Sequence, residues 1–313
     1  MLASLLSALM VGAITVMPEP DQVEDDADVS KDLETDETSA EAGNPGGILE
    51  GSADDDVLNG STGDDQIVGG EGDDVLSGLD GADSVLGQDG DDAILGDNGA
   101  DSLAGGHGAD TLDGGSDNDS LTGMSGGDTL FGDFGNDILE GGPGADFVSG
   151  GDGDDNLSGG LGNDTLVGGE GRDALFGGQG DDLVMDQGTG TDFLNGGLGS
   201  DTLVGAAGDY FHGGEGSDTY VIELSPEINE LTDPAIIQDY DESEDELFVL
   251  YDEGTDDDVP TLSLDPEPDD QGLWSIRIDG QVIAKTDSTD LNIDKVILLG
   301  AKEAATLGIE AFA

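Results

Sequence analysis

The fold is decided by a nonapeptide, of which one copy reads Gly69-Gly70-Glu71-Gly72-Asp73-Asp74-Val75-Leu76-Ser77. Fifteen units of this kind follow one another without a gap over residues 51–185. Every unit begins with glycine, carries aspartate at its sixth place and carries Leu, Ile or Val at its eighth place. The fourth place is glycine in thirteen units and aspartate in two, at Asp54 and Asp117. Such regularity predicts a repeat architecture in which stacked units share one continuous core.

The last three places of each unit are predicted to form a strand, and the first six places a turn. Side chains alternate across a strand, so the apolar eighth place faces inward in every unit. Two units then make one flattened coil of eighteen residues, with a strand on each side. Glycine at the first and fourth places permits turn conformations that a Cβ would obstruct. Stacked coils give a parallel β-solenoid with strands about 4.8 Å apart.

Four looser units continue the array over residues 186–221. The unit 186–195 has one residue too many and the unit 205–212 is one residue short, so we expect both to disturb the register of the coil. These units keep aspartates at Asp192, Asp201, Asp209 and Asp218. Among them, only Asp201 is predicted to act together with the sixth-place aspartates of the regular array.

The charge of the chain excludes several classes of function. Its 313 residues include 75 acidic and 6 basic side chains, for a formal net charge of −69. Nucleic-acid binding needs a basic face, and docking on anionic membranes needs basic clusters, so neither is expected. The chain has no cysteine and only two histidines, which excludes disulfides, thiolate sites and a three-histidine zinc site.

The interior of such a coil is too small to hold it together unaided. Each unit buries one large aliphatic side chain, whereas ordering a glycine-rich chain is costly in entropy. Stacking also brings the carboxylates of neighbouring coils together, and their repulsion opposes compaction. A hard cation would relieve both problems. Calcium takes about six to eight oxygen ligands from carboxylates and backbone carbonyls, which are the donors that these turns offer.

The repeat resembles the glycine- and aspartate-rich nonapeptide of the repeats-in-toxin (RTX) family, also called hemolysin-type calcium-binding repeats. The resemblance covers a little over half of the chain. It implies a right-handed parallel β-roll over residues 48–221. The residues that follow, 222–313, lose the repeat and are predicted from their strand patterns to form a β-rich C-terminal cap, so that the fold as a whole is all-β. Each calcium ion would lie between the turns of neighbouring coils and be shared by sixth-place aspartates two units apart.

The implied calcium ligands lie along two edges of the roll, with room for up to about thirteen ions in the regular array. The ligands on one edge are Asp56, Asp74, Asp92, Asp110, Asp128, Asp146, Asp164 and Asp182. Those on the other edge are Asp65, Asp83, Asp101, Asp119, Asp137, Asp155 and Asp173. Asp201, from the regular unit 196–204 that follows the array, is a further predicted ligand.

Three departures from the repeat carry expectations of their own. Arg172 stands beside Asp173 and is expected to weaken that site, and Asp54 and Asp117 either strain their turns or add a ligand. Acids at the fifth place, such as those at positions 64, 73 and 154, are expected to face outward. His107 and His212 are expected to have solvent or packing roles without a partner.

The flanking segments differ from the array. Residues 1–17 are apolar and uncharged, and they are interpreted as an export signal, an anchor or a packed helix. The acidic segment 18–47 is predicted to be a disordered linker. The C-terminal region is predicted to contain a hairpin over residues 273–284, turning at an Asp-Gly pair, and strands over residues 247–251 and 296–299.

The resemblance also implies export by a type I secretion machinery, with an uncleaved signal for which the tail 302–313 is the candidate. We therefore predict a non-catalytic, extracellular calcium-binding protein that folds outside the cell, with a structural or interaction role at the cell surface or in the matrix. One alternative is an adhesin. The other is a small extracellular enzyme with its site in the last ninety residues, which contain no histidine and no recognisable triad.

Overall fold

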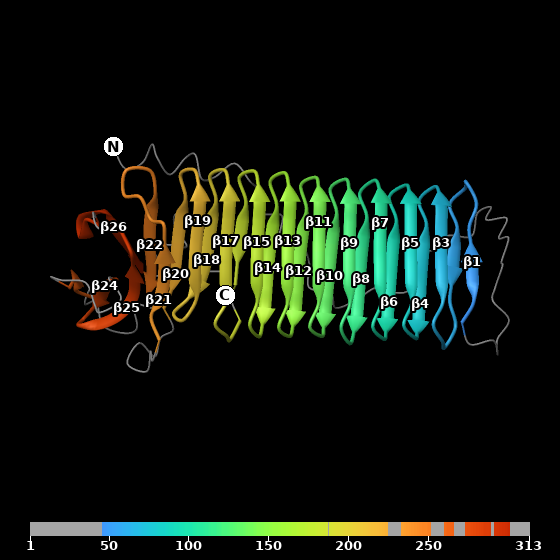
Figure 1. The fold of residues 1–313 in the computed structure, drawn as a ribbon, viewed down its shortest axis with the longest axis horizontal. Helices are drawn as coiled ribbons and strands as arrows, with labels where there is room; N and C mark the ends of the chain where they lie inside the picture. Colours follow the sequence, from blue (N-terminus) through green and yellow to red (C-terminus); the bar gives the residue numbers. More distant parts are fainter. Residues whose placement is uncertain are drawn as a thin grey trace.

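The computed structural model describes residues 46–186, 188–224, 233–251, 260–265, 273–288 and 291–300. In these ranges the chain folds as a parallel β-solenoid whose coils stack along the long axis of the molecule (Figure 1). The described residues contain no α-helix, and their one helical element is the 3-10 helix η3 (Ile293–Lys295). None of the described segments is a helix of the length and hydrophobicity that crossing a membrane requires.

The solenoid has two sheets, and the chain passes from one to the other at every turn. The first sheet comprises, in spatial order, β1 (Ile48–Glu50), β3 (Gln66–Glu71), β5 (Ser84–Asp89), β7 (Ser102–His107), β9 (Ser120–Ser125), β11 (Ile138–Pro143), β13 (Asn156–Leu161), β15 (Ala174–Gln179), β17 (Phe193–Leu198), β19 (Tyr210–Glu215), β21 (Ala235–Gln238), β25 (Gln281–Thr286), β24 (Trp274–Ile278) and β23 (Leu262–Leu264). Its strands are parallel except for the antiparallel pairs that β24 makes with β25 and β23.

The second sheet is parallel throughout. It comprises β2 (Val57–Asn59), β4 (Val75–Asp80), β6 (Ala93–Asn98), β8 (Thr111–Ser116), β10 (Thr129–Phe134), β12 (Phe147–Asp152), β14 (Thr165–Glu170), β16 (Leu183–Met185), β18 (Thr202–Ala206), β20 (Thr219–Glu223), β22 (Glu246–Tyr251) and β26 (Val296–Gly300). The regular array of units thus gives an all-β, parallel solenoid, as predicted.

Most strands are longer than the sequence predicts. The pairing of β3 with β5 continues past the apolar triplet, with Gly70 opposite Gln88 and Glu71 opposite Asp89. The first three places of the following unit therefore belong to the strand, and their assignment to the turn was wrong. The extension requires a positive φ at the second place, which is 133° at Gly70 and 93° at Gln88; glycine adopts this conformation readily, whereas L side chains rarely do. The turn is left with places four to six, so the sixth-place aspartate ends it.

The inward direction of the eighth place is confirmed. These aliphatic side chains form one continuous core through the coils, and all of them are buried from Leu58 to Val184. In β11 the alternation is sharp, since Leu139 is 1% exposed and its neighbour Ile138 is 58% exposed. Each coil therefore contributes two core side chains and shares them with the coils above and below.

The two irregular units do not disturb the register, contrary to expectation. Ala174 of β15 pairs with Phe193 of β17, and Phe193 pairs in turn with Tyr210 of β19. The extra residue is taken up in the connection between β16 and β17, and the missing one at the short strand β18. The extra residue lies in a connection that carries no ladder pairing, and the missing one only shortens β18, so the stack continues.

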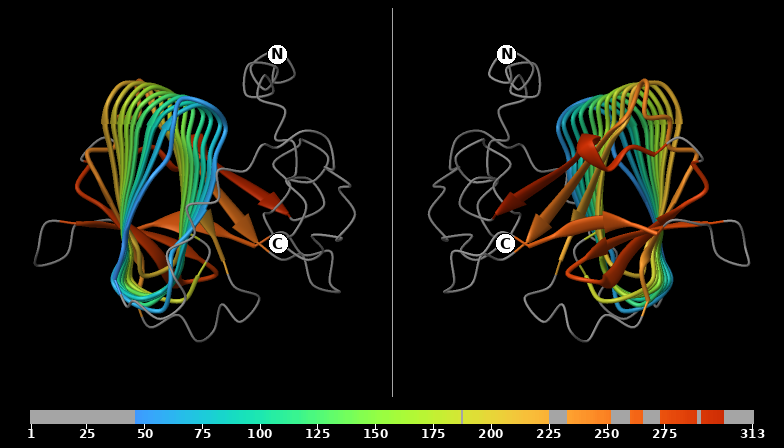
Figure 2. Two further views of the ribbon diagram at one scale, coloured as in Figure 1. Left: turned by 90° about the vertical axis from the view of Figure 1, so that its right-hand side faces the viewer. Right: turned by 90° about the vertical axis from the view of Figure 1, so that its left-hand side faces the viewer.

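The C-terminal strands extend both sheets of the stack, β21 and β25 in the first and β22 and β26 in the second (Figure 2). The predicted hairpin is present as β24 and β25, with Asp279 and Gly280 at positive φ values of 50° and 86°. The other two predicted strands are β22 and β26. The apolar segment 1–17, nearly all of the linker 18–47 and the tail 302–313 lie outside the described residues.

The contrast between Leu139 and Ile138 generates a first prediction. Leu139→Ala leaves a cavity in the shared core and should lower the free energy of unfolding by about 2–5 kcal/mol. Ile138→Ala removes an exposed side chain of similar size and should change that free energy by about 0.5 kcal/mol or less. Urea unfolding in saturating calcium, followed by circular dichroism, measures both. Equal losses in the two variants would contradict the inward direction of the eighth place.

Candidate metal centres

The sixth-place aspartates form two ladders, one along each edge of the roll. The backbone N–H of each aspartate donates a hydrogen bond to Oδ1 of the aspartate one coil further on, at 2.7–2.9 Å throughout the regular array. One ladder runs from Asp56 to Asp182 and the other from Asp65 to Asp173, which are the two edges that the resemblance implied. Apart from Asp56, where its ladder begins, one carboxylate oxygen of each residue therefore accepts a backbone N–H and holds neighbouring coils together.

The second carboxylate oxygen has no partner in most of these residues. Fourteen Oδ2 atoms are buried without a hydrogen bond, and they belong to Asp74, Asp83, Asp92, Asp101, Asp110, Asp119, Asp128, Asp137, Asp146, Asp155, Asp164, Asp173, Asp182 and Asp201. A buried, unsatisfied carboxylate oxygen is costly and calls for an explanation such as an ion. The two remaining predicted residues differ, because Oδ2 of Asp56 accepts from Ser52 and Oδ2 of Asp65 accepts from Ser61.

Backbone carbonyls complete the donor set. A Cβ added to Gly159, at the first place of its unit, would lie 2.5 Å from Asp164 Oδ2 and 2.7 Å from the carbonyl oxygen of Gly177 in the next coil. A carboxylate oxygen and a carbonyl oxygen thus converge beside a glycine that leaves the space open. Hard oxygen donors of these two kinds are what calcium prefers, so the described residues fit the ion.

Burial and repulsion disturb the titration of the ladders. Burial, followed by contributions from nearby carboxylates, raises the pKa of Asp74 and Asp101 to about 6 and that of Asp119, Asp173 and Asp201 to about 7. The backbone N–H that each Oδ1 accepts lowers the pKa only in part. The charged form of each group is therefore unfavourable unless a cation balances it.

Side chains beside the ladders are placed partly as expected. The fifth-place acids Asp64, Asp73 and Asp154 are exposed, as predicted. The guanidinium of Arg172 donates to Asp154 at 2.7 Å, which lowers the pKa of that carboxyl, and it points into solvent with 71% exposure. Of the two glycine replacements, only Asp117 has a positive φ, of 80°.

The expectation that the histidines lack partners was wrong for both. Nδ1 of His212 lies 3.0 Å from Oδ2 of Asp239, in the strand connection that follows β21. Nδ1 of His107 lies 2.6 Å from the hydroxyl oxygen of Ser125. The cause is stacking, since residues far apart in the sequence become neighbours in the next coil.

Sequence reasoning left out several residues of the ladders. Asp192 and Asp209 continue one ladder after Asp173, and Asp218 and Asp245 continue the other after Asp201. The irregular unit lengths argued against the first two. Asp245 lies outside the repeat but, like every ladder aspartate, stands two residues before an inward side chain, here Leu247, and that spacing was the available signal.

Comparison with known proteins supports calcium as the ligand. A family model described as the RTX calcium-binding nonapeptide repeat (4 copies) matches residues 50–85, 86–121, 113–148, 122–157, 149–184 and 186–220. The matched segments together span more than half of the chain. No curated protein matches the chain.

The neighbouring residues Asp92 and Asp91 offer a matched test of the ladder. Asp92→Asn keeps an Oδ1 that can accept the N–H of Asp74 but removes a buried charge, so it should weaken calcium binding at the adjoining sites by about tenfold or more. Asp91→Asn removes an exposed charge and should leave binding unchanged. Isothermal titration calorimetry with calcium distinguishes the two, and equal effects would argue against ligation by the ladder.

The raised pKa values predict how the metal-free roll depends on pH. Aspartates that titrate near 3.9 when unfolded and at about 6–7 when folded favour folding while they are protonated. That stability is present below about pH 4 and is lost as the pH rises through 6–7. In a chelator, circular dichroism should therefore show more β-structure at pH 4.5 than at pH 7.5. A metal-free chain that gains structure on going to pH 7.5 would contradict this.

Proposed function

The chain belongs to the family of proteins with RTX calcium-binding nonapeptide repeats, and from this premise we propose that it is a secreted, non-catalytic protein whose β-roll folds on meeting extracellular calcium. Calcium binding is the property that these repeats share. The proposal adds to it the ligands, the number of ions and the place of folding. Up to about thirteen ions would bind in the regular array, each between sixth-place aspartates of successive coils.

The fourteen buried Oδ2 atoms without a hydrogen bond are the observation that carries this proposal. When bound, calcium supplies positive charge between carboxylates that otherwise repel one another. The protein's own part is to place the donors. Oδ1 of each aspartate fixes the neighbouring coil through its N–H, Oδ2 stays available, and the first-place glycine leaves room beside it.

Secretion and folding are connected in this proposal by charge. With a formal net charge of −69 and a small aliphatic core, the chain is poorly able to compact where calcium is scarce. It would therefore stay unfolded inside the cell, pass through a type I secretion machinery and fold outside, where calcium is abundant. The candidate secretion signal is the tail 302–313.

A structural or interaction role, rather than catalysis, suits the surface of the roll. Its two sheets present long faces whose outward side chains include large apolar groups, among them Phe134, Ile138 and Met124, with exposures of 61%, 58% and 47%. Such side chains can contact another macromolecule at the cell surface or in the matrix. The ladders themselves hold carboxylates and carbonyls committed to ions and coil pairing.

Calcium-dependent folding is the central test. The full chain at pH 7.5 should show little β-structure by circular dichroism in a chelator and should gain it as calcium is added, with apparent dissociation constants of roughly 10⁻⁴–10⁻³ M. Magnesium at the same concentrations should not replace calcium, because it demands a smaller octahedral site and gives up its water reluctantly. A chain equally folded with and without calcium would contradict the proposal.

A further inference from the structure

One unit departs from the repeat at its first place. All fifteen regular units begin with glycine, and so do the units that start at residues 196, 205 and 213. The unit 186–195 begins instead with Asp186, directly after β16. A carboxylate therefore stands at the place where every other coil keeps open space, and this residue is not one of the sixth-place ligands.

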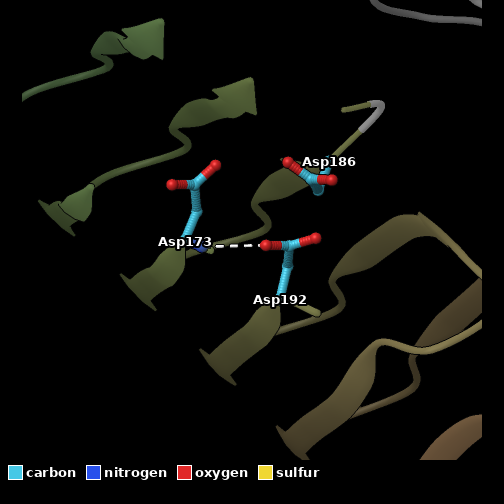
Figure 3. Close-up of side chains that lie close together, drawn as sticks. All are labelled: Asp173, Asp186 and Asp192. Atoms are coloured by element: carbon cyan, nitrogen blue, oxygen red, sulfur yellow. Dashed lines mark hydrogen bonds between the residues drawn. The ribbon is translucent and has the colours of Figure 1, made fainter. Parts of the chain in front are cut away.

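The backbone holds Asp186 in the stack while its side chain turns inward. Its N–H donates to the carbonyl oxygen of Val204 at 2.8 Å, and the residue is only 2% exposed. The carboxylate lies beside those of Asp173 and Asp192, and one oxygen from each of the three lies within 4.8 Å of the others (Figure 3). Asp186 and Asp192 lie at the two ends of the connection between β16 and β17, and Asp173 lies one coil earlier, in the connection between β14 and β15. The stacking of coils therefore brings Asp173 to the other two.

An unpartnered oxygen points to an ion in this cluster. Asp173 is 3% exposed, and its Oδ2 is buried without a hydrogen bond. A Cβ added to Gly168 would meet Oδ1 of Asp186 and would lie 2.7 Å from Oδ2 of Asp173. At Gly150, two units earlier on the same edge, the equivalent atoms are Oδ2 of Asp155 and the carbonyl oxygen of Gly168. Asp186 thus adds a charged oxygen where a regular coil offers a neutral one.

The charge of the cluster is not relieved by the basic residue next to it. Arg172 precedes Asp173 but donates to Asp154 in the coil before and is largely in solvent. The hydrogen bonds that the Asp186 carboxylate accepts from Gly169 and Gly188 come from neutral backbone groups, since Oδ1 accepts from the N–H of Gly169 and Oδ2 from the N–H of Gly188, each at 3.2 Å. Three buried carboxylates at this separation repel one another strongly unless a cation lies among them.

We propose that Asp186 makes the site between Asp173 and Asp192 a calcium site with three carboxylates, which binds the ion more tightly than the regular sites and fills first. This inference rests on the proposed calcium binding of the roll and names the residue that sets one site apart. Calcium affinity rises with the number of charged ligands in a site, so a third carboxylate should tighten binding by about tenfold or more.

The test compares calcium titrations of four full-length proteins. Asp186→Gly restores the repeat, and Asp186→Asn removes the charge while keeping an oxygen acceptor. Asp89→Asn removes an exposed acid from β5 and serves as the control for net charge. The unsubstituted chain and the Asp89→Asn variant should show one ion bound at least about tenfold more tightly than the rest. Both Asp186 variants should lose this step and keep the remaining stoichiometry.

Other outcomes separate failure of this inference from failure of the proposed function. A tight step that persists in both Asp186 variants, or a single uniform phase in the unsubstituted chain, would overturn the inference and leave calcium-dependent folding intact. Failure of both variants to fold in saturating calcium would also overturn it, because the effect should be confined to one site. If none of the four proteins binds calcium, the proposed function itself is wrong.

Discussion

The close approach of carboxylates along two edges is the interaction on which the whole roll depends. Each coil places two aspartates beside those of its neighbours, and burial makes their charges costly. The aliphatic core is continuous but narrow, with one large side chain per unit. A cation held by these oxygens, as proposed, would turn the repulsion into cohesion, and this would connect the acidic composition with the fold.

The two carboxylate oxygens of the ladder aspartates have different roles. Oδ1 accepts a backbone N–H from the preceding coil, which sets the rise between coils and the direction of the side chain. In fourteen of these residues, Oδ2 is thereby aimed at the space beside the first-place glycine and has no hydrogen bond. The fold thus orients the donors, so binding of an ion and folding of the coils would be coupled.

The irregular coils show which parts of the repeat can change without disrupting the fold. The connection between β16 and β17 accepts an extra residue, and the pairing of β15 with β17 keeps its register. What does not change is the aspartate that precedes each inward side chain, because it serves both the backbone ladder and the donor set. The same tolerance allowed Asp186 to enter the first place of a unit without breaking the stack.

The sequence by itself determined the period of the coil, the inward face, the two edges of aspartates and the C-terminal hairpin, because each depends on spacing within one or two units. Only the tertiary structure decided how far the strands extend past the apolar triplet and how Phe193 keeps its register. It also decided that Asp245 continues one ladder and that Asp186 lies beside Asp173 and Asp192 of the other. These features arise from pairing between coils, across separations of 17 to 27 residues that vary where the repeat is irregular. A linear pattern does not specify which turn absorbs an insertion, whereas hydrogen bonding between stacked backbones does.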